Sequence, residues 1–150
     1  MKFDDTFHVW GHLVASRGFN QDEIRIYSDD KIDVTSGAHI CQITMVGVPG
    51  TVEVYEGGKV DTVVMCANDG KLTVFSGGVV GSVICYQGQI TVKRGGLVTS
   101  ADITNGAKLT VYSGGMVTEI TKTSSAELDI RAGGIVTTIK TEDLNDENEA

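Results

Sequence analysis

Apolar residues recur along the chain in columns at fixed distances from a repeated glycine. The residues five and three before this glycine are apolar in every copy, with a polar residue between them. The residues three and six after it are also apolar in every copy. Successive glycines are 20, 20, 18, 19 and 19 residues apart: Gly37, Gly57, Gly77, Gly95, Gly114 and Gly133. A period near 19 residues indicates a repeat architecture.

The alternation of apolar and polar positions predicts short strands with one buried face. We expect one strand before each glycine, a second after it and, beyond a corner, a third. A further column, eight after the glycine, is apolar in the first four copies, Met45, Met65, Cys85 and Ile103, and weakens to Lys122 and Thr141 in the last two. Such a unit is one coil of a solenoid, whose stacking turns each column into a ladder of like side chains.

The sequence therefore predicts an all-β fold, a single-domain parallel β-helix (β-solenoid) with an N-terminal cap. It would contain about six to seven coils of 18–20 residues. An antiparallel sandwich with similar turn spacing is the alternative. The handedness of the coil stays open, because short-coil helices of both hands occur.

The repeated glycine is half of a Gly-Gly pair in five of the six copies, and the first copy reads Gly37-Ala38. A tight corner between two strands needs backbone angles with positive φ, which glycine adopts without penalty. In a helix, each pair would cost about 2 kcal/mol relative to alanine. The pairs therefore favour corners between strands.

The repeats divide the chain into three parts. Residues 1–30 are expected to form an N-terminal cap with a degenerate first coil, and residues 31–141 the solenoid repeats. Residues 142–150 are an acidic tail without column residues.

The degenerate first coil can be aligned over residues 7–26. Gly11 then occupies the turn and Val14 the position three after it. Ile24 and Ile26 match the columns six and eight after the glycine, which requires a longer loop near residues 16–23. The aromatic residues gathered at this end suit a cap over the open core: Phe3, Phe7, Trp10 and Phe19.

Composition and charge narrow the choice of partners. The chain has 150 residues, 41% of them hydrophobic, with 19 Gly and one Pro. A formal net charge of −8, with lysines and arginines scattered singly, argues against nucleic acid as a partner. No apolar run approaches the roughly 18 residues of a membrane span, so we expect no membrane insertion by this chain.

The cysteines and the N-terminus bear on the compartment. Cys41, Cys66 and Cys85 are odd in number and include no CxxC pair, so neither a full disulfide framework nor a zinc site is indicated. The start, "MKFDDTFHVWGHL", carries acids where a signal peptide would be basic and then apolar. A complete chain of this kind would be cytoplasmic.

The best repeats, "LTVFSGGVVGSV" and "LTVYSGGMVTEI", have apolar columns on both sides of Gly-Gly. This unit resembles the strand-loop-strand repeat of AIDA-type autotransporter passenger domains, the adhesin stalks of Gram-negative surfaces. The resemblance covers about residues 31–141 and implies a parallel β-helix that is displayed at the cell surface or secreted. With no signal peptide at its start, the chain would be either a piece of a longer protein or a stand-alone solenoid.

The resemblance also implies O-glycosylation, because such passengers often carry heptose on Ser and Thr of the repeat. Carried over by position, the possible acceptors just before the turn are Ser36, Ser76 and Ser113. Those five after it are Thr62, Ser82, Ser100 and Thr138.

Catalysis and metal binding are not expected. The coils are short and nearly free of the long loops that wall the grooves of enzymatic β-helices. Asp29 and Asp30, with Asp22 and Glu23 nearby, fit a solvated charged loop. His8 and His12 have a helical metal-ligand spacing but would face differently on a strand and turn. We therefore expect no enzyme activity, no cofactor and no metal.

Two columns should face outward. The residue two after the glycine becomes apolar over the last four coils: Val79, Leu97, Met116 and Ile135. We call these four residues the apolar stripe; they either cover a core edge or form a face for self-association. The column two before the glycine carries aromatic residues of a kind found in contact surfaces and sugar sites: Tyr55, Phe75 and Tyr112.

The interpretation favoured by these features is a non-enzymatic structural or adhesive solenoid. Its partner would be a second copy, in a homo-oligomer or fibre, or a glycan or protein of a cell surface. An intracellular polymerising solenoid, similar in principle to bactofilins, is one alternative. A carbohydrate-binding or carbohydrate-processing β-helix that uses the aromatic column is the other.

Overall fold

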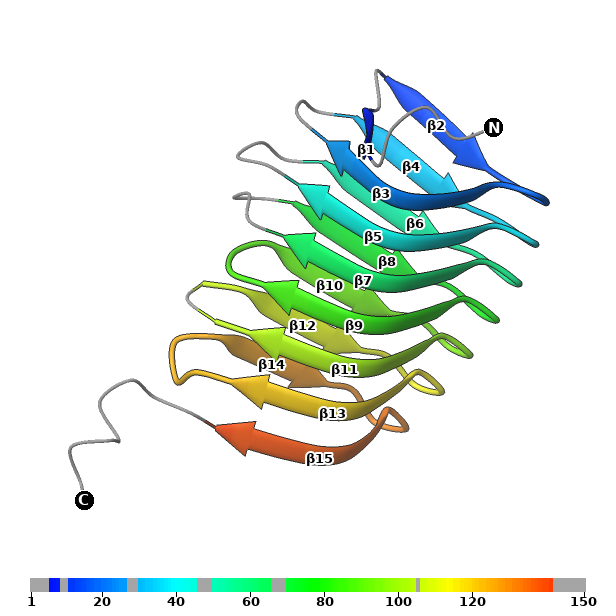
Figure 1. Cartoon of the computed structure of the whole chain (residues 1–150). Coiled ribbons are helices and arrows are strands. Elements are labelled where there is room, and N and C mark those ends of the chain that lie inside the picture. Colours follow the sequence, from blue (N-terminus) through cyan, green and yellow to red (C-terminus); the bar gives the residue numbers. More distant parts are fainter. Residues whose placement is uncertain are drawn as a thin grey trace.

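The computed structural model describes residues 6–8, 11–26, 30–45, 50–65, 70–104 and 106–141. All regular structure in these ranges is β-strand, arranged in two parallel sheets that stack coil upon coil (Figure 1). The predicted all-β parallel solenoid is confirmed. No helix in the described ranges is long and apolar enough to cross a membrane.

The longer strands form one sheet along the whole stack. In spatial order they are β1 (Thr6–His8), β3 (Asn20–Ile26), β5 (His39–Met45), β7 (Lys59–Met65), β9 (Val79–Cys85), β11 (Leu97–Ile103), β13 (Met116–Lys122) and β15 (Ile135–Thr141). Seven strands of four residues form the facing sheet: β2 (His12–Ala15), β4 (Lys31–Val34), β6 (Thr51–Val54), β8 (Lys71–Val74), β10 (Gln89–Val92), β12 (Lys108–Val111) and β14 (Glu127–Ile130).

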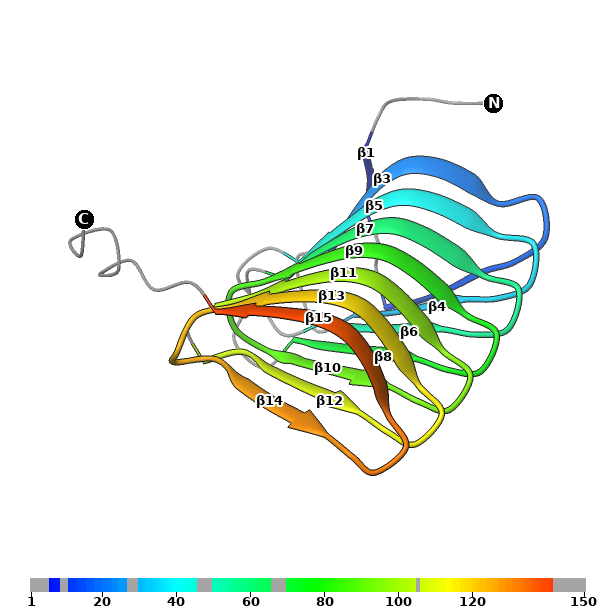
Figure 2. The ribbon, with the colours of Figure 1, turned by 90° about the horizontal axis from the view of Figure 1, so that it is seen from below.

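The coil has two strands, so the expected third strand is wrong. The columns three, six and eight after the glycine lie on one seven-residue strand. Between Ile40 and Ile43 of β5, two neighbouring residues stay outside the core, and the paired register with β7 skips Cys41. The predicted corner is therefore a bend inside a continuous strand, which Figure 2 shows as the curvature of the longer sheet. The ladder of hydrogen-bonded pairs continues on both sides of the bend, so the chain never leaves the sheet.

The apolar columns fill the space between the sheets, as predicted. Equivalent residues pair in register from coil to coil: Leu109 of β12 lies between Ile90 and Leu128. Leu109 and Ile90 are buried, whereas Leu128 is half-buried because β14 is the last strand of its sheet. Stacking thus buries the columns in the central coils and leaves them partly open at the C-terminal end.

Each corner between the two strands is a tight turn at the repeated glycine. In the second full coil the Gly58 N–H donates to the carbonyl oxygen of Tyr55 at 2.9 Å, and Gly57 has φ +80°. The Gly57 N–H donates to the carbonyl oxygen of Gly77 at 3.0 Å. The turns are therefore hydrogen-bonded to one another along the stack, like the strands.

The first coil corrects the predicted register. Gly18, with φ +88°, occupies the turn and donates its N–H to the carbonyl oxygen of Gly37. Gly11 therefore does not hold that position, and Val14, expected in the core, is 54% exposed. Leu13 and Ala15 pair instead with the core residues of β4. The longer loop expected near residues 16–23 is this turn and the start of β3.

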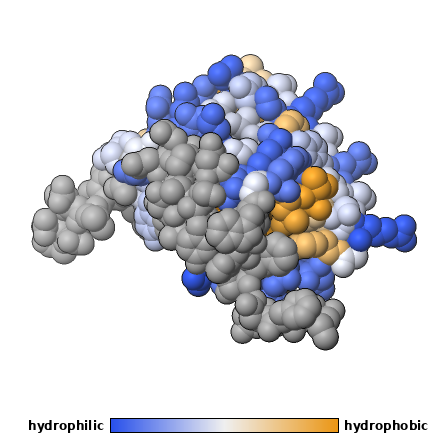
Figure 3. Space-filling model, turned by 90° about the horizontal axis from the view of Figure 1, so that it is seen from above, coloured by the Kyte–Doolittle hydropathy of each residue, from blue (hydrophilic) through white to orange (hydrophobic). Residues whose placement is uncertain are grey.

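The other half of that alignment is confirmed. Ile24 and Ile26 are buried and pair with Ile43 and Met45 of β5. Of the proposed cap, Phe19 packs against the core, whereas Phe3, Trp10 and the side chain of Phe7 lie outside the described residues. Seen from this end, Figure 3 shows an apolar area on the described surface. The acidic tail, residues 142–150, also lies outside.

Asp30 is not solvated, contrary to expectation. Its side chain lies at the corner before β4, and the residue is only 7% exposed. Its Oδ1 accepts the N–H of Gly11 at 2.7 Å, and the Lys31 N–H donates to the carbonyl oxygen of Gly11. The carboxylate is buried because it satisfies the backbone of the first coil where that coil departs from the repeat. Asp29 lies outside the described residues.

Candidate functional site

The outward column two before the glycine forms a ladder of side chains beside the seven-stranded sheet, in which two groups of rings and cations are in contact. The rings of Tyr55 and Phe75 are parallel within 1°, with centroids 4.8 Å apart. Tyr112 has the Lys93 Nζ 4.5 Å from its ring centroid, and the Arg131 guanidinium lies 5.1 Å from the same point. The ring spacing equals the distance between neighbouring strands, because successive coils carry successive members of the ladder.

Carboxylates on the same face anchor this ladder. The Tyr55 hydroxyl donates to Glu53, whose carboxylate also accepts the Lys31 ammonium at 3.1 Å. Burial opposes the ionisation of Glu53, but the hydrogen bonds from Tyr55 and Lys31 outweigh it, so the pKa of Glu53 is lowered. The bond to Glu53, together with burial, raises the pKa of Tyr55 to about 12.

The tyrosine titration of the protein should therefore include a late step from Tyr55. We expect Tyr55 to ionise near pH 12, about two pH units above the ordinary value of about 10. Its contribution to the free energy of unfolding is then fully present below pH 10 and is lost as the pH rises through 12. Ultraviolet absorbance of phenolate against pH measures this step.

Two variants assign that step. Tyr55→Phe should remove it, and Glu53→Gln should shift it toward pH 10 because the anionic acceptor is lost. Tyr112→Phe is the matched control and should leave the late step in place. A late step that persists in Tyr55→Phe would contradict the assignment.

The apolar stripe lies on the outer face of the eight-stranded sheet. Its residues are the first residues of β9, β11, β13 and β15, and they pair in register. Val79 and Leu97 are half-buried, whereas Met116 is 37% and Ile135 50% exposed. The stripe therefore faces outward, as expected, and becomes more exposed toward the C-terminal end.

The predicted glycosylation positions fall into two groups. Ser36, Ser76 and Ser113 lie beside the turn glycines and are exposed. The others lie on the eight-stranded sheet, where Thr62, Ser82 and Ser100 pair in one ladder and are half-buried. Thr138 of β15 is exposed. The hydroxyls at the turns are therefore the more accessible group.

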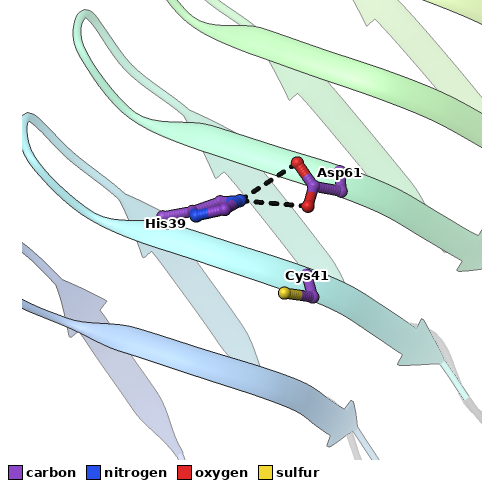
Figure 4. A group of neighbouring side chains, drawn as sticks. All are labelled: His39, Cys41 and Asp61. Atoms are coloured by element: carbon purple, nitrogen blue, oxygen red, sulfur yellow. Dashed lines mark hydrogen bonds and ion pairs between the residues drawn. The ribbon is translucent and has the colours of Figure 1, made fainter.

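A cluster that sequence reasoning missed lies on the outer face of β5 and β7. His39 and Cys41 come from β5 and Asp61 from β7, and each is half-buried (Figure 4). The His39 Nε2 lies 3.0 Å from both carboxylate oxygens of Asp61. The donor atoms of the three side chains lie within 4.8 Å of one another. A nitrogen, a sulfur and an oxygen donor thus converge, a set suited to a metal ion.

The signal for this cluster was present in the repeat. His39 and Cys41 are two residues apart, which places them on the same face of a strand. Cys41 and Asp61 are 20 residues apart, the step from Gly37 to Gly57, so they occupy equivalent positions in consecutive coils. The histidine pair considered instead is not a comparable cluster. His12 pairs with Asp33 at 2.7 Å, and the side chain of His8 lies outside the described residues.

Among known proteins, no protein-family model matches the chain, and no curated protein sequence does. A solved structure with a similar fold is the TibC-catalysed hyper-glycosylated fragment of TibA, with a TM-score of 0.65 and 26% sequence identity. The match covers 88% of this chain and 56% of the TibA chain, so this chain spans little more than half of that structure. The repeat is thus similar to the TibA repeat at the level of the fold.

Proposed function

We propose that the chain is a non-enzymatic, adhesin-like β-solenoid that associates with copies of itself through the apolar stripe. The observation that carries the proposal is the exposure of Met116 and Ile135 in a continuous register with Leu97 and Val79. Monomeric proteins rarely expose contiguous apolar patches, and such patches usually mark contact surfaces. The same ladder on a second copy would cover it.

The structural neighbour supports an adhesin-like role. The TibA fragment shares the fold over most of this chain. The repeat "LTVYSGGMVTEI" resembles that of AIDA-type adhesin passengers. We therefore propose that the solenoid works at the cell surface or after secretion, where it holds an adhesive surface away from its attachment. O-glycosylation at Ser36, Ser76 and Ser113 belongs to the proposal, because the neighbour is hyper-glycosylated and these hydroxyls are exposed.

Glycan binding by the aromatic column is less favoured. Sugars stack on the open face of an aromatic ring, and the facing sides of the Tyr55 and Phe75 rings cover each other. The Tyr112 ring is approached by two cationic side chains. The column is better suited to joining one coil to the next than to holding a saccharide.

Light scattering tests the self-association. We expect the apparent molecular mass of the wild type to rise with concentration. The double variant Leu97→Asp/Met116→Asp should stay monomeric, because association would bury its new carboxylates in the interface without a partner. Thr99→Asp/Thr118→Asp, on the same strands outside the stripe, is the matched control and should associate like the wild type. Circular dichroism checks that all three proteins fold.

The outcomes separate the alternatives. Wild-type protein that remains monomeric at all concentrations would contradict the proposal. Filaments formed by the purified chain under reducing conditions would instead favour an intracellular polymerising solenoid.

A further inference from the structure

We infer that His39, Cys41 and Asp61 form a binding site for a divalent metal ion of the zinc class. The site lies on the outer face of the eight-stranded sheet and joins two consecutive coils. It is separate from the apolar stripe, because the residues in the stripe column are polar in these coils: His39 itself and Lys59. The inference therefore stands whether or not the chain associates with itself.

The backbone directs the three side chains to one place. In the described strands β5 and β7, residues in the column two after the glycine and those in the column four after it lie on the outer face before the bend. His39 and Cys41 occupy these positions on β5, and Asp61 occupies the position of Cys41 on β7. Figure 4 shows the His39 ring directed toward Asp61, with Cys41 on the same side of the sheet.

The separations are close to those of a coordination shell. Zinc binds nitrogen and oxygen at about 2.0–2.2 Å and sulfur at about 2.3 Å, which places tetrahedral ligands about 3.5 Å apart. The nitrogen of His39 and the oxygens of Asp61 are already 3.0 Å apart, and the widest separation among the three donors is at most 4.8 Å. Metal binding therefore requires these donor atoms to close in from separations of at most 4.8 Å to about 3.5 Å.

The donor set selects the class of ion. One imidazole, one thiolate and one carboxylate suit zinc and its borderline neighbours, whereas calcium and magnesium prefer shells made of oxygen. Three protein ligands leave one position for water. The side chains of His39 and Asp61 are each 42% exposed, so an ion can enter the folded protein from solvent.

A second histidine–aspartate pair differs from the cluster in having no cysteine beside it among the described residues. His12 and Asp33 lie on neighbouring strands of the other sheet and are 2.7 Å apart. No cysteine belongs to a metal-ligand cluster with them among the described residues. The same pairing without sulfur therefore provides a built-in control for the role of Cys41.

Cobalt(II) substitution tests the site in the full chain under reducing conditions. We expect the wild type to bind one Co²⁺ with a thiolate-to-cobalt charge-transfer band and the intense visible bands of four-coordinate cobalt, and zinc should displace it. Cys41→Ser should abolish the charge-transfer band. His39→Ala and Asp61→Asn should each weaken binding about tenfold or more. His12→Ala should bind like the wild type.

Each outcome decides the inference. No cobalt or zinc binding by the folded wild type, as measured by calorimetry, would overturn it. So would a charge-transfer band that survives in Cys41→Ser, because the sulfur would then be one of the other two cysteines. Circular dichroism of each variant shows that a lost band does not come from lost folding. Bound zinc should also raise the melting temperature of the wild type and of His12→Ala, because the ion binds only the folded chain.

Discussion

Replacing Gly77 by alanine should lower the free energy of unfolding by about 3 kcal/mol. Gly77 has φ +81°, a conformation that costs an L-residue about 1–2 kcal/mol. A Cβ at this position would also lie 2.7 Å from the Cγ of Glu56 and 3.0 Å from its Cα. The Cα belongs to the backbone of the preceding coil, which is held by its own ladder, so relieving the contact requires the stacked turns to move apart.

Two other glycines separate these causes. Gly18 has φ +88°, but a Cβ added there would meet nothing within 4 Å. Gly18→Ala should therefore lower the free energy of unfolding only by the conformational cost of the positive φ, about 1–2 kcal/mol. Gly106 has neither a positive φ nor a close neighbour, and Gly106→Ala should leave stability nearly unchanged or slightly raised. Urea denaturation followed by circular dichroism measures all three. A loss in Gly77→Ala no larger than in Gly18→Ala would show that contact between the turns does not limit stability.

The stacked coils were predictable because the pattern of this sequence is redundant. Six copies repeat the same four apolar columns, so one unusual residue such as Ala101 does not hide the period. The turn glycines mark the same point of each coil, since a β-carbon there would meet the coil before it. Strand pairing therefore supports the same register in the described residues from Lys31 to Thr141, and burial supports it in the central coils.

The first coil was misjudged because that redundancy ends there. Gln21 breaks the column three after the glycine, and Ala15 is a weak apolar signal in the column three before. With these two columns weakened, the sequence offered both Gly11 and Gly18 as the turn glycine. Backbone geometry alone does not distinguish them, because both have positive φ. The prediction of a third strand was wrong for another reason. Periodicity indicates which residues are buried, and a bend inside a strand changes the burial pattern without interrupting the hydrogen-bonded ladder.

The metal-ligand cluster was missed because the sequence was searched for residues that repeat within a column. His39, Cys41 and Asp61 are each the single member of their kind in their column, so no repeat draws attention to them. They meet only because one coil places residues 20 apart side by side. In a solenoid, the search for a site therefore has to compare residues one period apart as well as residues adjacent in sequence.

Leucines at equivalent positions test how stability is distributed along the stack. Leu72 of β8 is fully buried between Val52 and Ile90, whereas Leu128, in the same column, is half-buried in the terminal strand β14. Leu72→Ala should lower the free energy of unfolding by about 3–4 kcal/mol, because it removes buried methyl groups and leaves a cavity between two coils. Leu128→Ala should cost about 1 kcal/mol, since fewer neighbours surround it.

The comparison is informative because the two variants make the same chemical change. Each coil contacts mainly its neighbours, so the end of a solenoid opens more easily than its middle. Hydrogen exchange should therefore show faster exchange confined to β12 and β14 in Leu128→Ala, and faster exchange spread over the central strands in Leu72→Ala. Both measurements belong at concentrations where light scattering finds monomers. Equal losses in the two variants would contradict this gradient, and would mean that the C-terminal coil is covered as well as the central ones are.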